Sequence, residues 1–463
     1  MKKIAIALVA VLVSFSAFGQ DVSGQWNGTL KVQGVELRLV FNINKTAAGG
    51  YTSTMDSPDQ GAKGIPVSST SFANGTLKLS AANLGVEYEG TLDADGDING
   101  TFKQGGLSLP LVLSQGAAKE RPRPQEPVKP YPYREEEVSF ENKEDGVTLA
   151  GTLTLPEKGS LFPAVVLISG SGAQNRDEEV MGHKPFLVLA DYLTRNGIAV
   201  LRYDDRGTAA STGNFKTATS FDFSKDAEAG VNYLLARKEI DRKKIGLIGS
   251  SEGGMIAPMI AARSKDVAFI VLLAGPGIPG DRLLLLQQEL IGRGYGTGEQ
   301  DVQKQVAVYR KAFELIRNST QPEKLAADLT SHFQEALKET PSVKPEQVSE
   351  EGFIRQQVRE ATTPWMQYFL TYDPVPALEK VQCPVLAING AKDLQVPPKI
   401  NLDAIRQALS KGGNTKATIK ELPGLNHLLQ ECETGLPLEY GTIEQTLSPL
   451  ALEEIQRWIA SLR

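Results

Sequence analysis

The sequence predicts an α/β fold with a doubly wound, mostly parallel sheet and a helical insertion, preceded by a small antiparallel all-β domain. Apolar runs alternate with helical stretches after residue 135, whereas apolar and polar residues alternate with a period of two before residue 115. Prolines are concentrated between these two regions. Buried strands that alternate with helices indicate a parallel sheet covered on both faces. A chain of 463 residues has the length of two or three domains.

The composition excludes several classes of function. The chain carries 49 basic and 55 acidic residues, and this near-balance argues against a nucleic-acid-binding groove. It contains three histidines and two cysteines, which are too few and too scattered for a zinc site, an iron–sulfur site or a disulfide scaffold. We therefore expect no metal and no organic cofactor. Any reaction step that needs a histidine has three candidates.

The first 19 residues have the pattern of a secretory signal peptide. Lys2 and Lys3 form a positive start, and the stretch Ile4–Val13 is apolar. Residues 17–19, Ala-Phe-Gly, fit a small-x-small cleavage site. The apolar stretch is shorter than the roughly 20 residues that a membrane span needs, and no later segment is apolar enough. No cysteine lies near the cleavage site, so we expect a periplasmic or secreted protein that is not a lipoprotein.

Residues 20–115 are expected to form an antiparallel β barrel or sandwich. Apolar side chains occupy every second position over Val35–Ile43 and Leu107–Leu113. Three Asn-Gly pairs are typical of the tight turns that join antiparallel strands. The next segment, residues 116–134, contains five prolines among charged residues. Because proline fixes φ and removes a backbone donor, this segment is predicted to be an extended linker at a domain boundary.

Residues 135–463 are expected to form the α/β domain. Five apolar runs are each followed by a glycine-rich turn or an Asp-containing loop: Ala164–Ile168, Ile198–Leu201, Ile245–Ile248, Phe269–Leu273 and Val385–Ile388. Between the fourth and fifth runs lies an insertion, at about residues 280–374, whose apolar residues follow a helical spacing. A helical insertion above the strand ends of such a sheet is placed to act as a lid.

Residues 249–253, Gly-Ser-Ser-Glu-Gly, match the pattern G-x-S-x-G. The match alone is weak, but a strand precedes it and a predicted helix, Met255–Ala262, follows it. A strand–turn–helix holds the central serine in a strained turn, with its hydroxyl above the sheet and glycines relieving the crowding. Ser251 is therefore the predicted nucleophile. The alternative is a serine-rich turn without a catalytic role.

A serine hydroxyl needs a base, which is usually histidine, and this type of turn takes its partners in the chain order Ser, Asp or Glu, His. Only His332 and His427 follow the serine. His332 lies in the helical insertion without a preceding acidic loop, so His427 is the predicted base. Asp393 follows a predicted buried strand and would orient the imidazole and stabilise its cation. A simple turn role for Asp393 is the alternative.

When a serine attacks a carbonyl carbon, negative charge develops on the carbonyl oxygen, and two backbone amides are needed to stabilise it. One is expected from Glu252, the residue after the nucleophile. The other is expected from the loop at residues 169–172, Ser-Gly-Ser-Gly, where the Ser171 amide is favoured over those of Gly170 and Gly172. The serine hydroxyls of this loop lack the strand–turn–helix setting and are interpreted as hydrogen-bonding groups.

Two other motifs are interpreted as structural. Residues 275–280 spell G-x-G-x-x-G, but two prolines remove the amides that a pyrophosphate would require. This segment is expected to be a rigid loop that leads into the insertion. Residues 203–207, Tyr-Asp-Asp-Arg-Gly, are interpreted as an ion-paired turn, with Asp177 near Arg206, and not as catalytic.

The chain resembles the α/β-hydrolase superfamily over about residues 135–463. The resemblance lies in the turn at residues 249–253, the order Ser251–Asp393–His427, the loop at residues 169–172 and the turn at residues 203–207. The match is close to exported bacterial esterases with an N-terminal β domain, which share strings like LISGSGAQNRDE and NGAKDLQVP and are often grouped with serine aminopeptidase-like hydrolases. The resemblance implies Ser251 as nucleophile, His427 as base, Asp393 as orienting acid, and activity on carboxylic esters with short acyl chains. Ser169 stands where many relatives have histidine, which puts the choice of oxyanion amides in doubt.

We therefore predict an exported serine carboxylesterase that forms an acyl-enzyme with a small acyl ester. An aminopeptidase or amidase is an alternative, because the Glu-rich insertion offers carboxylates for a substrate ammonium. A glycan-binding or docking protein with an inactive hydrolase domain is another, and the complete set of catalytic residues counts against it. The sequence leaves open a homodimer through the β domain or the lid. A disulfide between Cys383 and Cys432 would be geometrically unfavourable.

Overall fold

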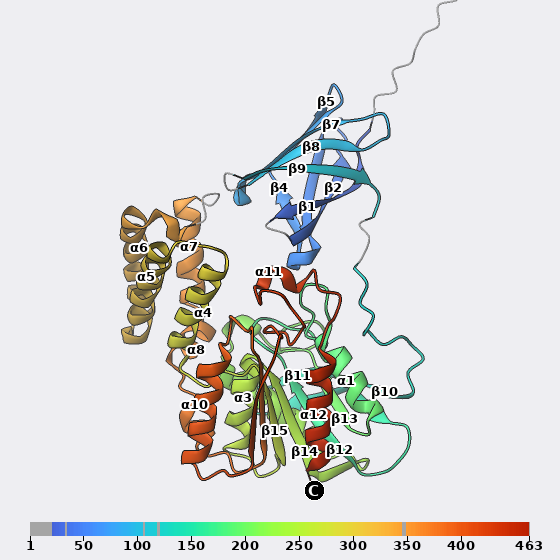
Figure 1. The fold of residues 1–463 in the computed structure, drawn as a ribbon, viewed down its shortest axis with the longest axis vertical. Coiled ribbons are helices and arrows are strands. Elements are labelled where there is room, and N and C mark those ends of the chain that lie inside the picture. The colour runs from blue at the N-terminus through green and yellow to red at the C-terminus, as the bar shows by residue number, and fades with distance from the viewer. Residues whose placement is uncertain (1–20, 33–34, 105–106, 118–120, 345–348, 463) are drawn as a thin grey trace, which may run out of the picture.

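The computed structural model describes residues 21–32, 35–104, 107–117, 121–344 and 349–462. They form a β domain and an α/β domain that are joined by a proline-rich segment (Figure 1). The predicted signal peptide, residues 1–19, lies outside the described residues. No helix within the described ranges is both long and apolar enough to cross a membrane.

The β domain is one nine-stranded antiparallel sheet, with the order β4-β3-β2-β1-β9-β8-β7-β6-β5. Its strands are β1 (Gly24–Val32), β2 (Val35–Lys45), β3 (Tyr51–Ser57), β4 (Ala62–Val67), β5 (Ser69–Ala73), β6 (Thr76–Ala81), β7 (Val86–Leu92), β8 (Ile98–Gln104) and β9 (Leu107–Gln115). The sheet curls until β3 meets β5, where the hydroxyls of Ser53 and Thr70 are 2.6 Å apart. Of the alternating side chains predicted to be apolar, Leu39, Phe41, Ile43, Leu111 and Leu113 face the inside of this near-barrel, where Phe41 and Tyr88 stack, whereas Leu107 is exposed. This confirms the predicted antiparallel fold of the first module.

The α/β domain contains an eight-stranded sheet with the order β10-β11-β13-β12-β14-β15-β16-β17. Its strands are β10 (Tyr133–Asn142), β11 (Val147–Pro156), β12 (Phe162–Ile168), β13 (Ala199–Tyr203), β14 (Ile240–Ser250), β15 (Phe269–Leu273), β16 (Val385–Gly390) and β17 (Ala417–Leu422). All pairs from β13 to β17 are parallel, whereas β10 and β11 add an antiparallel edge. The five apolar runs of the sequence correspond to β12–β16, which confirms the mostly parallel sheet.

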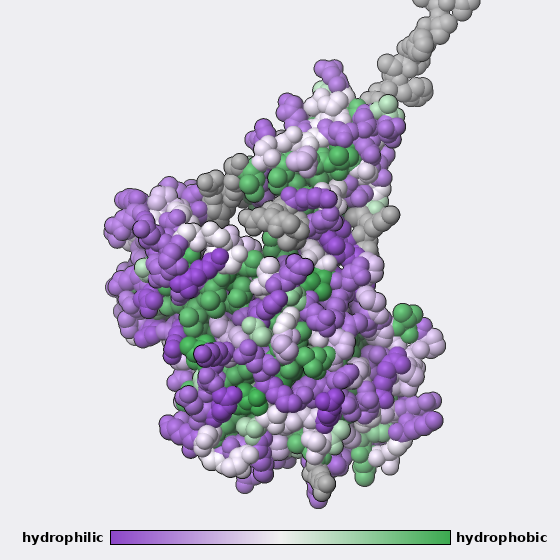
Figure 2. Space-filling model, in the orientation of Figure 1, coloured by the Kyte–Doolittle hydropathy of each residue, from purple (hydrophilic) through white to green (hydrophobic). Residues whose placement is uncertain are grey.

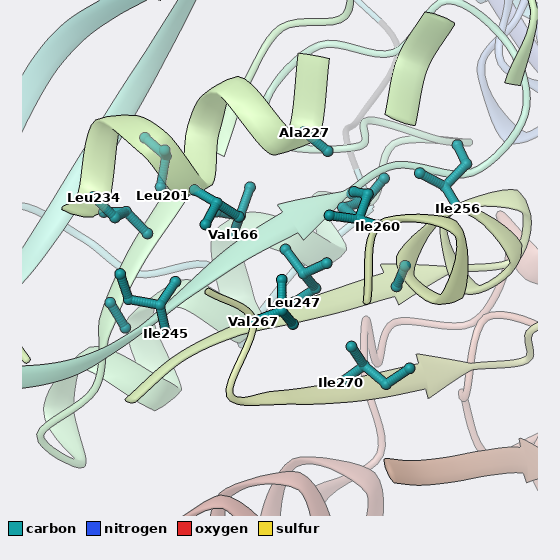
Figure 3. Packing of buried hydrophobic residues seen from close by; sticks show 14 of the residues in the cluster. Val166, Leu201, Ala227, Leu234, Ile245, Leu247, Ile256, Ile260, Val267 and Ile270 are labelled. Carbon is teal, nitrogen blue, oxygen red and sulfur yellow. The ribbon is translucent and has the colours of Figure 1, made fainter. Parts of the chain in front are cut away.

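Helices cover both faces of this sheet, as the doubly wound prediction requires. One face packs against α1 (Pro185–Arg195) and α12 (Pro449–Ser461). The other packs against α2 (Ser220–Leu235), α3 (Glu252–Ala261) and α10 (Pro398–Lys411). Figure 3 shows Ala227 and Leu234 of α2 and Ile256 of α3 above the buried strand residues. Each such aliphatic side chain contributes about 1.5–3 kcal/mol when fully buried, so this core holds the strand ends that carry the site.

The predicted helical insertion lies between β15 and β16. It comprises α4 (Gly280–Gly294), α5 (Glu299–Asn318), α6 (Pro322–Glu339), α7 (Glu350–Ala361) and α8 (Pro364–Thr371). The short helices α9 (Val375–Leu378) and α11 (Pro437–Tyr440) complete the α-helices. Helices α5 to α7 stand to one side of the sheet, with α4 and α8 next to it (Figure 1). The insertion has its own core, which includes Leu329 and Phe333.

The proline-rich segment is tied to the α/β domain and does not run free as an extended linker. The Arg123 guanidinium donates to the carbonyls of Gly182 and Gly441, at 3.0 and 2.9 Å. The Gln125 side chain accepts from the amides of Thr446 and Leu447, at 2.6 and 3.0 Å. Proline correctly predicted the absence of regular structure here, but the polar residues between the prolines fasten the segment to the loops beside β17.

The β domain also contacts the α/β domain directly. The buried carboxylate of Asp59, in the turn after β3, binds Arg38 of β2 and Arg121 of the proline-rich segment at 2.7 and 2.8 Å. The Asp59 carbonyl lies so close to Gly441, after α11, that a Cβ there would be 2.1 Å away. This junction, the contact of Asp59 and the proline-rich segment with the loops around α11, fixes the β domain beside the strand ends.

Candidate active site

Ser251 occupies a sharp turn between β14 and α3, with φ +50° and ψ −113°. A non-glycine residue in this region costs about 1–3 kcal/mol, so the surroundings must hold it. The Ser251 amide donates to the carbonyl of Leu273 at 2.8 Å. A Cβ at Gly249 would lie 2.0 Å from the carbonyl oxygen of Gly253, and a Cβ at Gly253 would lie 2.1 Å from that of Ile168. The two glycines of the motif are therefore sterically required by the turn.

The structure brings the three predicted side chains together. His427, in the loop after β17, places Nε2 3.2 Å from Ser251 Oγ and Nδ1 2.8 Å from Asp393 Oδ2. Asp393 follows β16, and its Oδ1 accepts from the amides of Gln395 and Val396, both at 2.8 Å. The Asp393 side chain is fully buried, and that of His427 is 8% exposed. In this arrangement the imidazole is hydrogen-bonded to the serine on one side and to the carboxylate on the other, which allows an imidazole to take a proton from a serine.

The His427 imidazole is a stronger base than a free histidine. Burial lowers its pKa, but the charge and hydrogen bond of Asp393 and the charge of Glu178 outweigh burial, so the pKa lies above its usual value. A base with a raised pKa holds the serine proton more firmly once it has taken it.

The loop at residues 169–174 lies beside the nucleophile, and two buried carboxyl groups fix it. Glu178 accepts from the Gly170 amide at 2.7 Å. Asp205 accepts from the Ser169 hydroxyl at 2.7 Å and from the Gln174 amide at 2.9 Å. The Gly170 amide is thus already used within the protein. Within the described part of the chain the Ser171 amide makes no hydrogen bond, which supports its choice over that of Gly170.

Glu252, the other predicted oxyanion residue, begins α3, where backbone amides have no partner within the helix. Its side chain is buried and points away from solvent to two donors. The carboxylate accepts from Ser220 Oγ at 2.5 Å and from Trp365 Nε1 at 2.8 Å. Because Trp365 belongs to α8, the residue after the nucleophile is directly bonded to the lid.

Besides Asp393, three buried acids therefore lie near Ser251: Glu178, Asp205 and Glu252. Burial raises the pKa of Glu178 to about 7 and that of Asp205 to about 8, and it also raises the pKa of Glu252. Sequence reasoning missed Glu178 altogether and read Asp205 as part of an ion-paired turn. Neither had a distinct signal, since Glu178 lies in a run of charged residues that is typical of a solvated loop.

The ion-paired turn itself is present, with different partners from those expected. Asp204 binds Arg176 at 2.8 Å, and Arg206 binds Asp226 at 2.6 Å. The predicted proximity of Asp177 to Arg206 is wrong, because Asp177 pairs with Arg202. Arg202 lies on β13, and its guanidinium is also 3.9 Å from the carboxylate of Glu135 on β10.

The remaining candidates have structural settings. His183 is buried and bonds Thr446 and Tyr440, and the His332 Nε2–H donates to the Val308 carbonyl at 2.9 Å inside the lid. The glycine- and proline-rich loop leads from β15 into α4, as expected. Cys383 and Cys432 are both free. No cluster of three or more His, Cys, Asp or Glu side chains in the described ranges is arranged to hold a metal ion.

The lid contributes a cavity of about 550 Å³ among α4, α5, α7 and α8. Its walls are mainly apolar and aromatic, including Leu284, Tyr309 and Phe313. Gln287 lines the cavity and also donates to Gln395, two residues after Asp393, at 3.4 Å. Figure 2 shows hydrophobic residues gathered in the hollow between the lid helices and the rest of the α/β domain, below the β domain. The volume is that of a small-molecule site.

Comparisons with known proteins agree with a hydrolase. Residues 145–418 match the family model of X-Pro dipeptidyl-peptidase (S15 family). Esterase EstD of Thermotoga maritima is 25% identical over 444 residues, which cover 95% of this chain and 87% of that protein. An uncharacterized protein of Pseudomonas aeruginosa, PA2218, is 29% identical over 170 residues, or 36% of this chain and 42% of the relative. The solved structure of the Pyrococcus furiosus esterase Pf2001 covers 71% of this chain and 92% of its own, with 14% identity and a TM-score of 0.41.

Proposed function

The chain belongs to the X-Pro dipeptidyl-peptidase (S15) family and has an α/β-hydrolase fold, and from this premise we propose that it is an exported serine hydrolase that cleaves small carboxylic esters. The observation that carries the proposal is the hydrogen-bonded chain from Ser251 Oγ through His427 to Asp393. Ser251 attacks the acyl carbonyl while His427 Nε2 takes its proton. The Glu252 and Ser171 amides bind the developing oxyanion. His427 then protonates the leaving alcohol, and water, activated in the same way, releases the acid and the free serine.

The family match favours a second candidate, cleavage of a dipeptide from a peptide N-terminus. Such a substrate carries an ammonium group, which a carboxylate near the nucleophile would have to bind. The three buried acids beside Ser251 are instead bonded to protein donors: Glu178 to Gly170, Asp205 to Ser169 and Gln174, and Glu252 to Ser220 and Trp365. Burial also raises the pKa values of Asp205 and Glu252, and a neutral carboxyl group binds ammonium weakly. This supports an uncharged ester as the substrate.

The test uses the mature protein, residues 20–463, with p-nitrophenyl esters of increasing acyl length and with an Xaa-Pro p-nitroanilide. We expect turnover of short esters, and a reduction of kcat by about 10⁴-fold or more in Ser251→Ala. Ser410→Ala, an exposed serine on α10, is the matched control and should retain full activity. Exclusive turnover of the anilide would assign the dipeptidyl-peptidase function instead. If a fluorophosphonate does not label Ser251 of the wild-type protein, the result would favour the alternative of a glycan-binding or docking protein with an inactive hydrolase domain.

Export is proposed from the first 19 residues. Expression of the full chain in a Gram-negative host should yield a periplasmic protein whose N-terminus is Gln20, and an uncleaved cytoplasmic product would contradict the proposal.

A further inference from the structure

Glu178 is a buried acid beside the candidate active site that the proposed mechanism does not use. It lies in the loop between β12 and α1, in the left-handed region at φ +51°, where its amide donates to the carbonyl of Asn175 at 2.9 Å. The residue is 7% exposed. A glutamate in this strained, buried position is held there by its surroundings.

The Glu178 carboxylate lies behind the oxyanion loop. Its Oε1 accepts from the Gly170 amide at 2.7 Å. A Cβ built on Gly170 would lie 3.2 Å from that oxygen and 3.4 Å from the Cβ of Ser251. Gly170 is thus enclosed between the carboxylate and the nucleophile, and the adjacent Ser171 amide moves with it. A shift of Glu178 would therefore displace the proposed oxyanion donor.

Glu178 also faces the catalytic base. The side chains of Glu178, Ser250 and His427 line a cavity of about 20 Å³, whose other walls are apolar residues such as Leu189 of α1 and Leu273 of β15. This volume accommodates at most one water molecule. A charge on Glu178 therefore acts on the imidazole with little screening.

The other charged groups near this pair are also acids. Asp205, from the loop after β13, interacts with Glu178 across the oxyanion loop, and Asp393 is hydrogen-bonded to Nδ1 of the imidazole. The Ser250 hydroxyl bonds the Glu178 carboxylate. Among the described residues, His427 is the one group that supplies positive charge to Glu178, and only when it is protonated.

We propose that Glu178 is a second acidic positioning residue of this active site: it holds the oxyanion loop against Ser251 and stabilises the imidazolium that His427 forms. The inference rests on the proposed hydrolase function. It does not require a bond between Glu178 and substrate. Ionised Glu178 favours the protonated base by simple electrostatics, and neutral Glu178 does not.

The test separates charge from position. Glu178→Gln keeps an oxygen that accepts from Gly170 but removes the charge, and Glu178→Asp keeps the charge on a shorter side chain. We expect Glu178→Gln to lower the pKa of His427 by about 1 unit, since opposite charges in contact shift a pKa by about that amount or more. The pKa is measured by NMR titration of the three labelled histidines, which needs no substrate. Glu178→Asp should restore the titration midpoint.

Kinetics provide the second readout. In Glu178→Gln the acid limb of the pH profile of kcat/KM for a short ester should move to lower pH, together with the midpoint of the NMR titration. The value of kcat should fall about 10-fold, and KM should stay nearly unchanged. Glu179→Gln, the exposed neighbour, is the matched control and should behave as wild type. An unchanged midpoint in Glu178→Gln, whatever its stability or kcat, would overturn the inference. Failure of the function itself would appear separately, as wild-type protein that neither turns over ester nor reacts with a fluorophosphonate.

Discussion

The junction between the two domains and the active site both bury acidic side chains, but the partners of those acids differ. At the junction, burial raises the pKa of Asp59, but its contacts with Arg38 and Arg121 outweigh burial, so that the pKa lies below its usual value. In the active site, Glu178 and Asp205 are each bonded to a backbone amide and a serine hydroxyl, and burial raises their pKa values. The junction acid is therefore fixed in its charged form, whereas the active-site acids can change their charge near neutral pH.

The two buried histidines show the same contrast. At the junction, His183 Nε2 donates to the Tyr440 carbonyl at 2.9 Å and Nδ1 is 3.0 Å from the Thr446 hydroxyl. Burial and the nearby charge of Arg123 lower the pKa of His183 to about 4, since no carboxylate offsets them. In the active site, Asp393 reverses the effect of burial on His427. Burial alone therefore does not mark a candidate catalytic group, whereas burial with a specific charged partner beside a candidate nucleophile is typical of one.

The largest expected effect concerns the active site, where Asp393 reverses the effect of burial on the pKa of His427. Asp393→Asn removes the charge that raises the pKa of His427 and lets the imidazole adopt the wrong tautomer, so kcat for a short ester should fall by about 10³- to 10⁴-fold. Asp266→Asn, an exposed aspartate before β15, is the control. The measurement is kcat at saturating ester for both variants. A rate within 10-fold of wild type would assign the orienting role to another acid.

The next effect tests the junction. Asp59→Asn leaves two guanidinium groups without their shared carboxylate, and we expect the free energy of unfolding of the β domain to fall by about 2–3 kcal/mol. The exposed pair of Glu36 and Lys31 offers the control variant Glu36→Gln, which should cost less than about 1 kcal/mol. Urea unfolding measures both. Activity on a short ester below the unfolding transition should stay within about 2-fold, and a large loss of kcat would mean that the junction contributes to catalysis.

The sequence predicted the backbone features of the active site well because steric rules determine them locally. The turn at Ser251 needs glycine at both flanking positions, and chain order left His427 as the one suitable base. Asp393 followed from its place after a buried strand. These three side chains are also the ones that hydrogen-bond to one another in the structure.

Features that depend on tertiary contacts were not predicted. Glu178 acquires its role because the loop between β12 and α1 folds back behind Gly170, and nothing in a charged run of residues indicates this. Strands β10 and β11 mix apolar and polar residues and were not recognised as the antiparallel edge of the sheet. The proline-rich segment was expected to be extended, but Arg123 and Gln125 find carbonyl and amide partners that are distant in sequence.

The last prediction concerns pH, and it sharpens the contrast between the two histidines. His183 has a pKa of about 4 in the folded protein and about 6.5 when unfolded, so the unfolded state binds more protons between these values. Its contribution to stability is complete above pH 6.5 and is lost as the pH falls toward 4, by up to about 3 kcal/mol. Because its pKa is raised, His427 changes the pH dependence of stability in the opposite direction. This contribution is the same in wild type and in His183→Gln, so it cancels when the two proteins are compared. Urea unfolding at pH 8 and pH 5 should therefore show a smaller loss of stability on acidification in His183→Gln than in wild type. Equal losses of stability in the two proteins would contradict this prediction. They would mean that His183 is protonated in the folded protein at pH 5 and that the junction tolerates its charge.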